Sequence, residues 1–410
     1  MIKEKFEKIV KKITIRIVQT EIDTINRKDI TSTGLRMYDG KSIGVAGTIG
    51  KYDEAQLEKK AVENLDLKLP YPCSPTGKFS EKKTFDTPPI QESSFVAEVE
   101  EILSALGKSY PEFIFSNQIS LSDVSHALKN DQGLDLFNRN CYLETSVIFK
   151  EKASTSIFDG YFSFESRKYD RNELLKLAGK ICTGYQSKVD LPKTSRIPVI
   201  FSTSNSLPFK KFQEDLNVWK IGTKTSLFTE KFGKKIFNEN FSLVQSFHPD
   251  DTMGPFFDYE GIVNKDYRYP LIKNGIIEDA YTDKRSAQKF SLPQTGSGFG
   301  DFDELPSAQL ENYIVPESDK TIKELLTGRM GIYAYLTSGG DFTPSGGFGT
   351  PVQLGYLFDG EKLVGRLPQF HISSNVYDMF GKDFIGVSKD LITPLENSRY
   401  LAMEMNIEKE

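Results

Sequence analysis

Residues 256–300 read FFDYEGIVNKDYRYPLIKNGIIEDAYTDKRSAQKFSLPQTGSGFG, and this stretch indicates how the chain is built. Its centre predicts a hairpin that runs from Tyr267 to Tyr281 and turns at Asn274-Gly275. Asn-Gly tolerates the positive φ angles that a two-residue type I′ turn requires. Asp39-Gly40 and Asp359-Gly360 predict two more strand–turn–strand units. Three such units predict a sheet-rich protein and not a helical bundle.

The bulk composition is that of a folded, multi-domain protein. A length of 410 residues predicts two or three domains. Apolar residues make up 38% of the chain and aromatic residues 12%, enough to build hydrophobic cores. The net charge is −5, with lysines interleaved among acids, whereas phosphate binding relies on clustered Lys and Arg. We therefore expect no general nucleic-acid binding.

Cysteine spacing and the N-terminus predict a cytoplasmic protein. Cys73, Cys141 and Cys182 have no short spacing, so neither a disulfide framework nor a zinc ribbon is expected. The first residues, MIKEKFEKIVKK, lack the apolar region of a signal peptide. No run approaches the roughly 18 apolar residues of a membrane span. We expect no membrane association.

Hydrophobic periodicity predicts alternating helices and strands in the N-terminal half. Apolar residues at helical spacing predict helices over 2–11, 53–65, 95–106 and 172–185. Alternating patterns predict strands over 13–17, within 112–164 and over 196–202. The segment 66–92 holds five prolines and is expected to be a linker or long surface loop.

The C-terminal half is predicted to consist mainly of strands. Residues 207–237 are expected to be mostly helical, and one further helix is expected at Thr321–Gly328. Beyond Phe241 the other segments favour strands and loops. The fold class is therefore α+β, with a first domain over 1–190 and a second over 191–410.

Motifs of the common hydrolases are absent from the sequence. The histidines, His126, His248 and His371, are more than a hundred residues apart, so a catalytic zinc site held by this chain alone is disfavoured. A Ser-His-Asp triad stays open, although no Gly-x-Ser-x-Gly elbow is present. The loop GSGFG (296–300) lacks the third glycine of a dinucleotide fingerprint, which favours a flexible connection.

Two acidic positions are candidates for chemistry or binding. Asp258 and Glu260 are two residues apart, so on a strand they would share a face and could form an acid–base pair or bind a cation. An exposed strand end with solvated carboxylates is the favoured alternative. Asp341 lies in a glycine-rich loop where Phe342 can anchor the backbone. Asp341 could contact a peptide or another chain, or only cap a turn.

Several segments in order resemble the TldD/PmbA family, once described as modulators of DNA gyrase. The similar segments are GLRMYDGKSIG (34–44), DYEG (258–261), LIKNG (271–275), DKRSA (283–287), TGSG (295–298), GDFT (340–343), Gly360, VSKD (387–390) and EMNI (404–407). The resemblance covers most of the chain and implies a β-rich, barrel-like C-terminal domain. It also implies a two-subunit zinc metallopeptidase that acts on unfolded peptides.

Within that family, the zinc-binding TldD branch carries His-Glu-x-x-x-His and a C-terminal Cys, whereas the PmbA (TldE) branch lacks them and pairs with TldD. This chain is similar to the second branch. The motif position holds Phe209, Lys210, Lys211, Phe212, Gln213 and Glu214, and Asn397-Ser-Arg-Tyr400 stands where the Cys is expected. The resemblance thus implies no catalytic or metal-binding residue in this chain, and zinc in the partner subunit.

The expected partners are a TldD-like catalytic chain and a peptide substrate. Candidate contacts are Asp258, Glu260, Arg285, Asp341 and Phe342. The alternative is a stand-alone homodimeric binding or structural protein without proteolytic activity. A nucleic-acid-associated gyrase modulator would fit the older family description, but the acidic composition opposes it.

Overall fold

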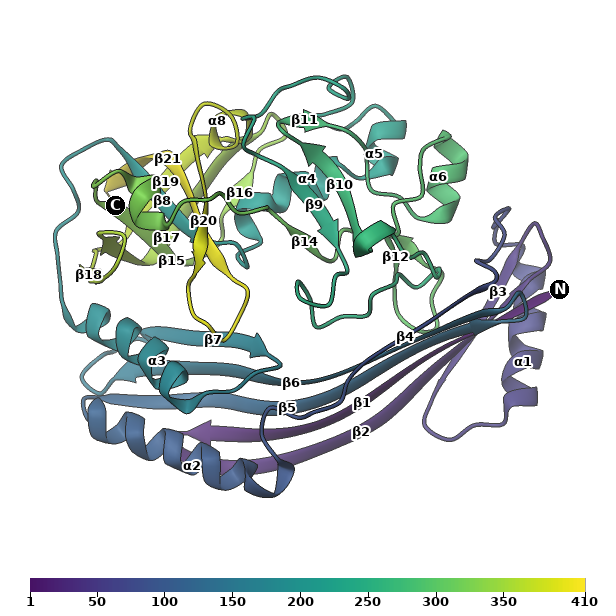
Figure 1. Ribbon diagram of the computed structural model, residues 1–410, viewed down its shortest axis with the longest axis horizontal. Helices are drawn as coiled ribbons and strands as arrows, with labels where there is room; N and C mark the ends of the chain where they lie inside the picture. Colours follow the sequence, from purple (N-terminus) through teal and green to yellow (C-terminus); the bar gives the residue numbers. More distant parts are fainter. Residues whose placement is uncertain (410) are drawn as a thin grey trace.

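The computed structural model describes residues 1–409 and shows a long curved sheet beneath a β-rich body (Figure 1). The strands of the sheet all come from the first 166 residues. The body is built from residue 196 onward and lies above the concave side of the sheet. This arrangement leaves one face of the sheet directed at the C-terminal half.

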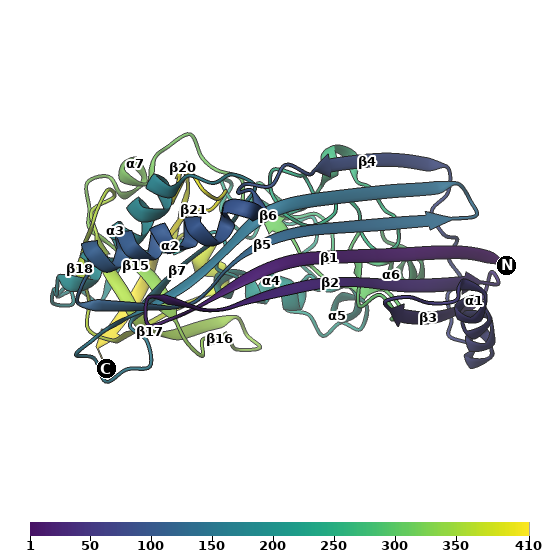
Figure 2. The ribbon, with the colours of Figure 1, turned by 90° about the horizontal axis from the view of Figure 1, so that it is seen from below.

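Four long strands form the centre of the sheet, in the order β2 (Glu21–Tyr38), β1 (Ile2–Val18), β5 (Phe113–Asn130) and β6 (Leu134–Glu151). Their three pairings are antiparallel. β3 (Ile43–Ile49) extends the sheet beside β2. β4 (Phe79–Phe85) and β7 (Gly160–Ser166) pair with different parts of β6, and β4 does so in parallel. Figure 2 shows these strands from below.

The helix expected at residues 2–11 is wrong, because this segment is the first half of strand β1. Ile2, Phe6, Ile9 and Val10 happen to fit helical spacing. Strands β2 and β5 flank the segment on both sides and satisfy its backbone with two ladders of hydrogen bonds. The tertiary pairing therefore decides its conformation, which local periodicity could not reveal.

Two other expectations need correction. The proline-rich segment 66–92 is not only a linker, because it contains strand β4 between its two groups of prolines. Residues 207–237 are helical only in their first part, with short elements η2 (Leu207–Phe209), α4 (Lys210–Asp215) and α5 (Val218–Gly222). The rest of that segment has no helix or strand. The phenylalanines of residues 207–237 pack one by one into the hydrophobic core and do not form the apolar face of a single helix.

The remaining predicted helices are confirmed as α1 (Glu54–Glu63), α2 (Glu92–Ser109), α3 (Arg171–Gln186) and α7 (Ile322–Leu326). A short 3-10 turn, η1 (Asn64–Leu67), follows α1. Asp53 and Asp170 cap α1 and α3 by accepting hydrogen bonds from backbone N–H groups of the first turn. Helix α2 lies beneath the convex face of the sheet (Figure 1).

The C-terminal half contains a closed five-stranded barrel. Its ring is β15 (Gly331–Thr337), β8 (Arg196–Ser202), β21 (Arg399–Lys409), β19 (Phe370–Asn375) and β17 (Gly347–Phe358), and β17 pairs with β15 to close it. β16 (Asp341–Phe342), β18 (Leu363–Arg366) and β20 (Phe384–Leu391) are attached to this ring. The predicted β-rich, barrel-like architecture is confirmed, and β8 has the predicted bounds.

A smaller sheet contains the stretch that opened the sequence analysis. It consists of β11 (Ile276–Ile277), β10 (Arg268–Lys273), β9 (Leu243–Ser246) and β14 (Tyr313–Ile314). The Asn274-Gly275 hairpin is confirmed, with φ angles of 49° and 79° at the two turn residues. Its second strand is shorter than predicted. The remaining elements are η3 (Lys265–Tyr267), α6 (Lys284–Phe290), β12 (Gly298–Phe299), β13 (Ser307–Ala308) and α8 (Val376–Met379).

One hydrophobic cluster joins the sheet to the barrel. Phe149 of β6 and Tyr185 of α3 lie with ring centroids 5.4 Å apart, and the same cluster includes Tyr356 of β17. Helix α3 therefore forms part of a core shared by both halves. The domain boundary near residue 190 stays a prediction. No helix within residues 1–409 is long and apolar enough to cross a membrane.

Candidate functional site

A groove runs between the concave face of the sheet and the C-terminal half. It consists of two adjoining cavities of about 1040 Å³ and 800 Å³. They share five lining residues, which are Glu144, Glu165, Thr252, Met253 and Asn312. This groove is the candidate functional site.

The floor of the groove follows from strand periodicity. Successive side chains of a strand point to opposite faces, so every second residue reaches the groove. Lys8, Val10 and Lys12 of β1 line it, and register pairs Lys8 with His126 and Lys12 with Ser122 of β5. Ile13, Ile15 and Ile17, at the alternate positions further along β1, belong to the hydrophobic cluster on the convex side. The same alternation that builds the core therefore supplies a polar floor.

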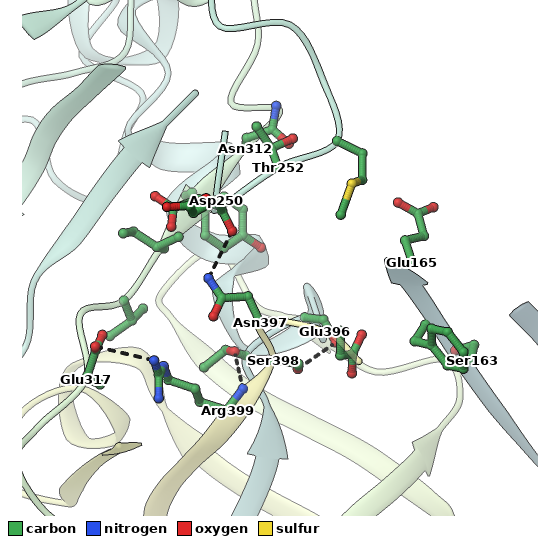
Figure 3. Close-up of a pocket in the computed structure, with 18 of the residues that line it drawn as sticks. Ser163, Glu165, Asp250, Thr252, Asn312, Glu317, Glu396, Asn397, Ser398 and Arg399 are labelled. Atoms are coloured by element: carbon green, nitrogen blue, oxygen red, sulfur yellow. Dashed lines mark hydrogen bonds and ion pairs between the residues drawn. The ribbon is translucent and has the colours of Figure 1, made fainter. Parts of the chain in front are cut away.

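Loops of the C-terminal half form the opposite wall (Figure 3). They are residues 250–253 after β9, residues 312–317 around β14, and residues 396–399 at the start of β21. Several of their charges are neutralised locally. Arg268 pairs with Asp251 at 2.7 Å and Arg399 with Glu317 at 3.4 Å. On the floor, Lys12 pairs with Glu144.

Two carboxyl groups and one imidazole of the groove depart from their usual pKa. Burial, reinforced by the nearby Glu165, raises the pKa of Glu396 to about 7. Burial and the neighbouring Glu144 raise the pKa of Glu165. Burial, with a smaller contribution from Lys8, lowers the pKa of His126 to about 3. His126 is therefore a neutral imidazole near pH 7, and Glu396 is poised between its two protonation states.

Residues 209–214, where the zinc motif was expected from the resemblance, do not fit a zinc ion. Phe209 and Phe212 are buried, and Phe212 packs against the rings of Phe228, Phe237, Phe241 and Phe380. The buried Lys211 ammonium lies 2.6 Å from the Asp215 carboxylate. No imidazole or thiolate stands there to replace the missing ligands. Across residues 1–409, no group of three or more His, Cys, Asp or Glu side chains could hold a metal ion.

Asp258 and Glu260 do not form an exposed strand end, so the favoured interpretation of this pair is wrong. Their residues are 0% and 3% exposed, and they lie in a turn that ends at Gly261, where φ is 74°. Asp258 accepts hydrogen bonds from the backbone N–H groups of Glu260, Ile262 and Gly298. The pair is thus a buried anchor of the polypeptide fold and not a solvated surface.

Glu260 links the N-terminal half to three of the segments that resemble the family. These segments are 258–261, 283–287 and 295–298, and the link to the N-terminal half is made through Tyr71. The Glu260 carboxylate accepts hydrogen bonds from the Tyr71 hydroxyl at 2.6 Å and from the Lys284 backbone N–H at 2.7 Å. Burial and the nearby Asp258 raise the pKa of Glu260. Gly298 lies against it so closely that a Cβ there would come within 2.6 Å of Glu260 Oε2. Glycine is therefore required at this position.

Arg285 lies in the same region and is partly buried. Its Nη2 donates to the backbone carbonyl of Pro306 at 3.2 Å, and Asp283 beside it caps α6. The Thr295–Gly300 loop is not the flexible connection that was favoured, because residues 295–299 are buried. Gln245 Nε2 donates to the carbonyls of Thr295 and Gly296 and holds the loop in place.

Asp341 and Phe342 lie in β16, beside α4 and away from α6, the helix that contains Arg285 (Figure 1). The Asp341 carboxylate is 60% exposed and pairs with Lys210 at 3.0 Å, and this partner lowers its pKa. Phe342 is buried against Phe348, with ring centroids 4.8 Å apart. The expected anchoring role of Phe342 is confirmed, whereas peptide contact by any of the five candidates stays a prediction.

Glu165, Glu396 and His126 were not singled out as binding residues from the sequence. Glu165 follows the alternating pattern of the β7 segment, where Phe162 and Phe164 are buried, so its strand face could have been deduced. Glu396 lies in a loop, and only the fold brings it near Glu165. Sequence spacing contains no signal for that proximity.

The fold and its motifs define a β-barrel protein of the TldD/PmbA type. The profile of the PmbA/TldA metallopeptidase C-terminal domain matches residues 194–405. The chain therefore belongs to the TldD/PmbA family. The resemblance stated from the sequence is confirmed.

Known relatives and solved structures agree with this assignment. The chain is 24% identical over 211 residues to a zinc metalloprotease TldD homolog of Saccharolobus solfataricus, covering 48% of this chain and 47% of that protein. It thus spans about half the length of this relative. TldE from Thermococcus kodakarensis has the same fold, with a TM-score of 0.80 at 18% identity, covering 100% of this chain and 96% of that one. A Thermotoga maritima protein described as a modulator of a DNA gyrase gives 0.77 at 16%, with the same coverages.

Proposed function

We propose that this chain is the metal-free, TldE-like subunit of a TldD/TldE-type zinc peptidase, and that its groove helps to enclose an unfolded peptide beside a catalytic sister chain. The observation that carries the proposal is a large groove in a family member whose zinc-motif position holds buried phenylalanines and a lysine–aspartate pair. A chain of this kind can bind a peptide but lacks the ligands for a zinc-activated water.

The groove has the chemistry that an extended peptide requires. Its floor and walls combine hydroxyls, amides and charges with apolar positions such as Val10, Val124 and Met253. Among the described strands, β7 pairs only with β6 and lines the groove, so a peptide could align with its other edge and exchange backbone hydrogen bonds. A cytoplasmic location belongs to the same proposal and agrees with three free cysteines.

Reconstitution with a sister chain tests the proposal. The full-length chain is co-expressed with a TldD-like protein that carries His-Glu-x-x-x-His, and the two are purified through a tag on this chain. We expect a stable complex that hydrolyses unfolded peptides, and zinc that is retained by the sister chain. The chain alone is expected to bind no stoichiometric zinc on elemental analysis.

Two controls make this test decisive. Replacing both motif histidines of the sister chain should abolish hydrolysis and leave pairing intact. Replacing His126, His248 or His371 of this chain should leave the zinc content unchanged. Tight zinc binding by this chain alone that is lost with any of these histidines would refute the metal-free assignment. Failure to pair, together with a stable homodimer, would favour the stand-alone binding or structural protein.

A further inference from the structure

The charges that line the larger cavity are mostly paired, and two carboxylates are the exception. Arg268, Arg399 and Lys12 neutralise Asp251, Glu317 and Glu144. The Asp250 side chain is 80% exposed at the rim, 3.7 Å from His248. Glu165 and Glu396 line the cavity, and neither carboxylate forms a hydrogen bond or ion pair within residues 1–409. The cavity therefore contains uncompensated negative charge.

Glu165 and Glu396 come from different halves of the molecule. Glu165 lies on β7, on the strand face opposite Phe164, and so points towards the groove. Glu396 lies in the loop between β20 and β21, which reaches down towards β7 (Figure 1). Figure 3 shows the two side chains on separate walls of one open space. A ligand in that space would contact both halves at once.

Electrostatics indicates what kind of ligand would be favoured there. Burial disfavours ionisation of Glu396, and the nearby Glu165 carboxylate adds to the effect, so the pKa of Glu396 rises to about 7. A cation beside both carboxylates would offset this repulsion and favour the ionised form of Glu396. Perturbed, unpaired carboxylates in a cavity are typical of binding sites and are disfavoured as purely structural features.

A second observation in the adjoining cavity also indicates a polar ligand. His126 is 5% exposed and lines this cavity, and its Nδ1 has no hydrogen-bond partner in the part of the chain described. A neutral imidazole has one donor and one acceptor nitrogen, so a peptide backbone can pair with either. The groove thus has polar groups without partners in both cavities, and an extended peptide rises about 3.3 Å per residue, so several residues could span them.

We propose that the groove prefers extended peptides that carry a basic group, and that the ammonium or guanidinium lies between Glu165 and Glu396. This inference rests on the proposed peptide-binding function and adds a substrate class to it. A lysine or arginine side chain and a free peptide N-terminus share this chemistry. A bare divalent cation is less suited, because it takes six or more oxygen ligands and only two carboxylates are available.

Three ten-residue peptides of Ala, Ser and Gly distinguish the sources of the cation. The first has a fluorescein-capped N-terminus and one central lysine, the second has norleucine instead of lysine, and the third has a free N-terminus, no lysine and a C-terminal label. Binding to the full-length chain is measured by fluorescence anisotropy. We expect the lysine peptide to bind about tenfold more tightly than the norleucine peptide, as a desolvated charge pair allows. If the third peptide, and not the lysine peptide, binds more tightly than the norleucine peptide, the bound cation is the peptide N-terminus.

Variants that neutralise Glu165 and Glu396 test whether the preference for lysine arises at these two carboxylates. The double variant Glu165→Gln with Glu396→Gln should bind both capped peptides equally, whereas Glu239→Gln, which removes one exposed charge outside the groove, should keep the preference. Circular dichroism of each variant confirms folding. If the unmodified chain binds all three peptides equally, the cation-site proposal is wrong, whereas the proposed peptide-binding groove is unaffected. If the chain binds none of the peptides, the peptide-binding groove is wrong as well.

Discussion

At the scale of single residues, carboxylates define the chemistry of this protein more than its histidines do. Glu260 is buried and fixed by the Tyr71 hydroxyl and the Lys284 backbone, whereas Glu396 and Glu165 are more exposed and lack such partners. A buried carboxylate with donors is a structural anchor, and an accessible one without partners is available to a ligand. The same residue type therefore has two different roles in one chain.

Glu260 should make stability depend on pH. Its pKa rises from 4.5 to about 8 in the folded state, because of burial and Asp258, so the folded chain holds the proton that the unfolded chain releases between these values. The free energy of unfolding should fall as pH rises through this window and then level off. Glu260→Gln should flatten this slope, measured as urea midpoints from pH 5 to pH 9.

Tyr71→Phe provides a control with the opposite sign. The Tyr71 hydroxyl stabilises the ionised Glu260 and lowers its pKa, so removing it should steepen the loss of stability with rising pH. If both variants keep the slope of the unmodified chain, another group is responsible for the pH dependence.

Asp341→Ala tests the contact role of the glycine-rich loop. The carboxylate is exposed and its partner Lys210 is also largely exposed, so the melting temperature should stay nearly unchanged. Peptidase activity or assembly of the reconstituted complex should decrease if Asp341 contacts the peptide or the sister chain. Lys210→Ala, measured in parallel, shows whether the ion pair itself matters. A destabilised Asp341 variant with undiminished activity would leave Asp341 only a capping role.

At the scale of elements, α3 is the helix on which the contact between the two halves depends. Leu174, Ala178 and Cys182 are buried along one face of it. Its N-terminus is held by Asp170, which accepts hydrogen bonds from the N–H groups of Asn172 at 2.8 Å and Glu173 at 3.2 Å. The end of this helix should therefore be sensitive to loss of its cap.

Asp170→Ala should lower the free energy of unfolding by about 0.5–2 kcal/mol, the usual effect of removing an N-cap. Asp170→Asn keeps a side-chain oxygen and should retain most of the stability. Urea unfolding of both variants at one pH is the measurement. Equal destabilisation by Ala and Asn would show that the charge and not the cap matters.

At the scale of the whole molecule, the shared core predicts one cooperative unfolding transition. Residues from β6, α3, β15 and β17 lie in a single hydrophobic cluster, so part of the apolar surface of each half is buried against the other. The single tryptophan, Trp219, lies in α5 and reports on the C-terminal half, whereas far-ultraviolet circular dichroism also reports on the long sheet.

Tryptophan fluorescence and circular dichroism should therefore give the same thermal midpoint. The variant Tyr185→Ala removes a ring between Phe149 and the barrel and should lower both midpoints together. Two separated transitions in the unmodified chain would contradict the shared core and favour independently folding domains.

The sequence by itself determined the elements that depend on local chemistry. The Asn274-Gly275 hairpin, the aspartate-capped helices and strand β8 follow from turn propensity, capping and a short apolar run, all of which act over a few residues. The ordered motifs also identified the family.

Only the tertiary structure decided features that depend on distant partners. Strand β1 has a pattern compatible with a helix and becomes a strand because β2 and β5 pair with it along its length. Asp258 and Glu260 become buried because Tyr71 and Gly298, far away in sequence, close over them. Glu165 and Glu396 line the same cavity because the β20–β21 loop extends over β7. Such proximity arises from packing across the chain, and no local pattern encodes it.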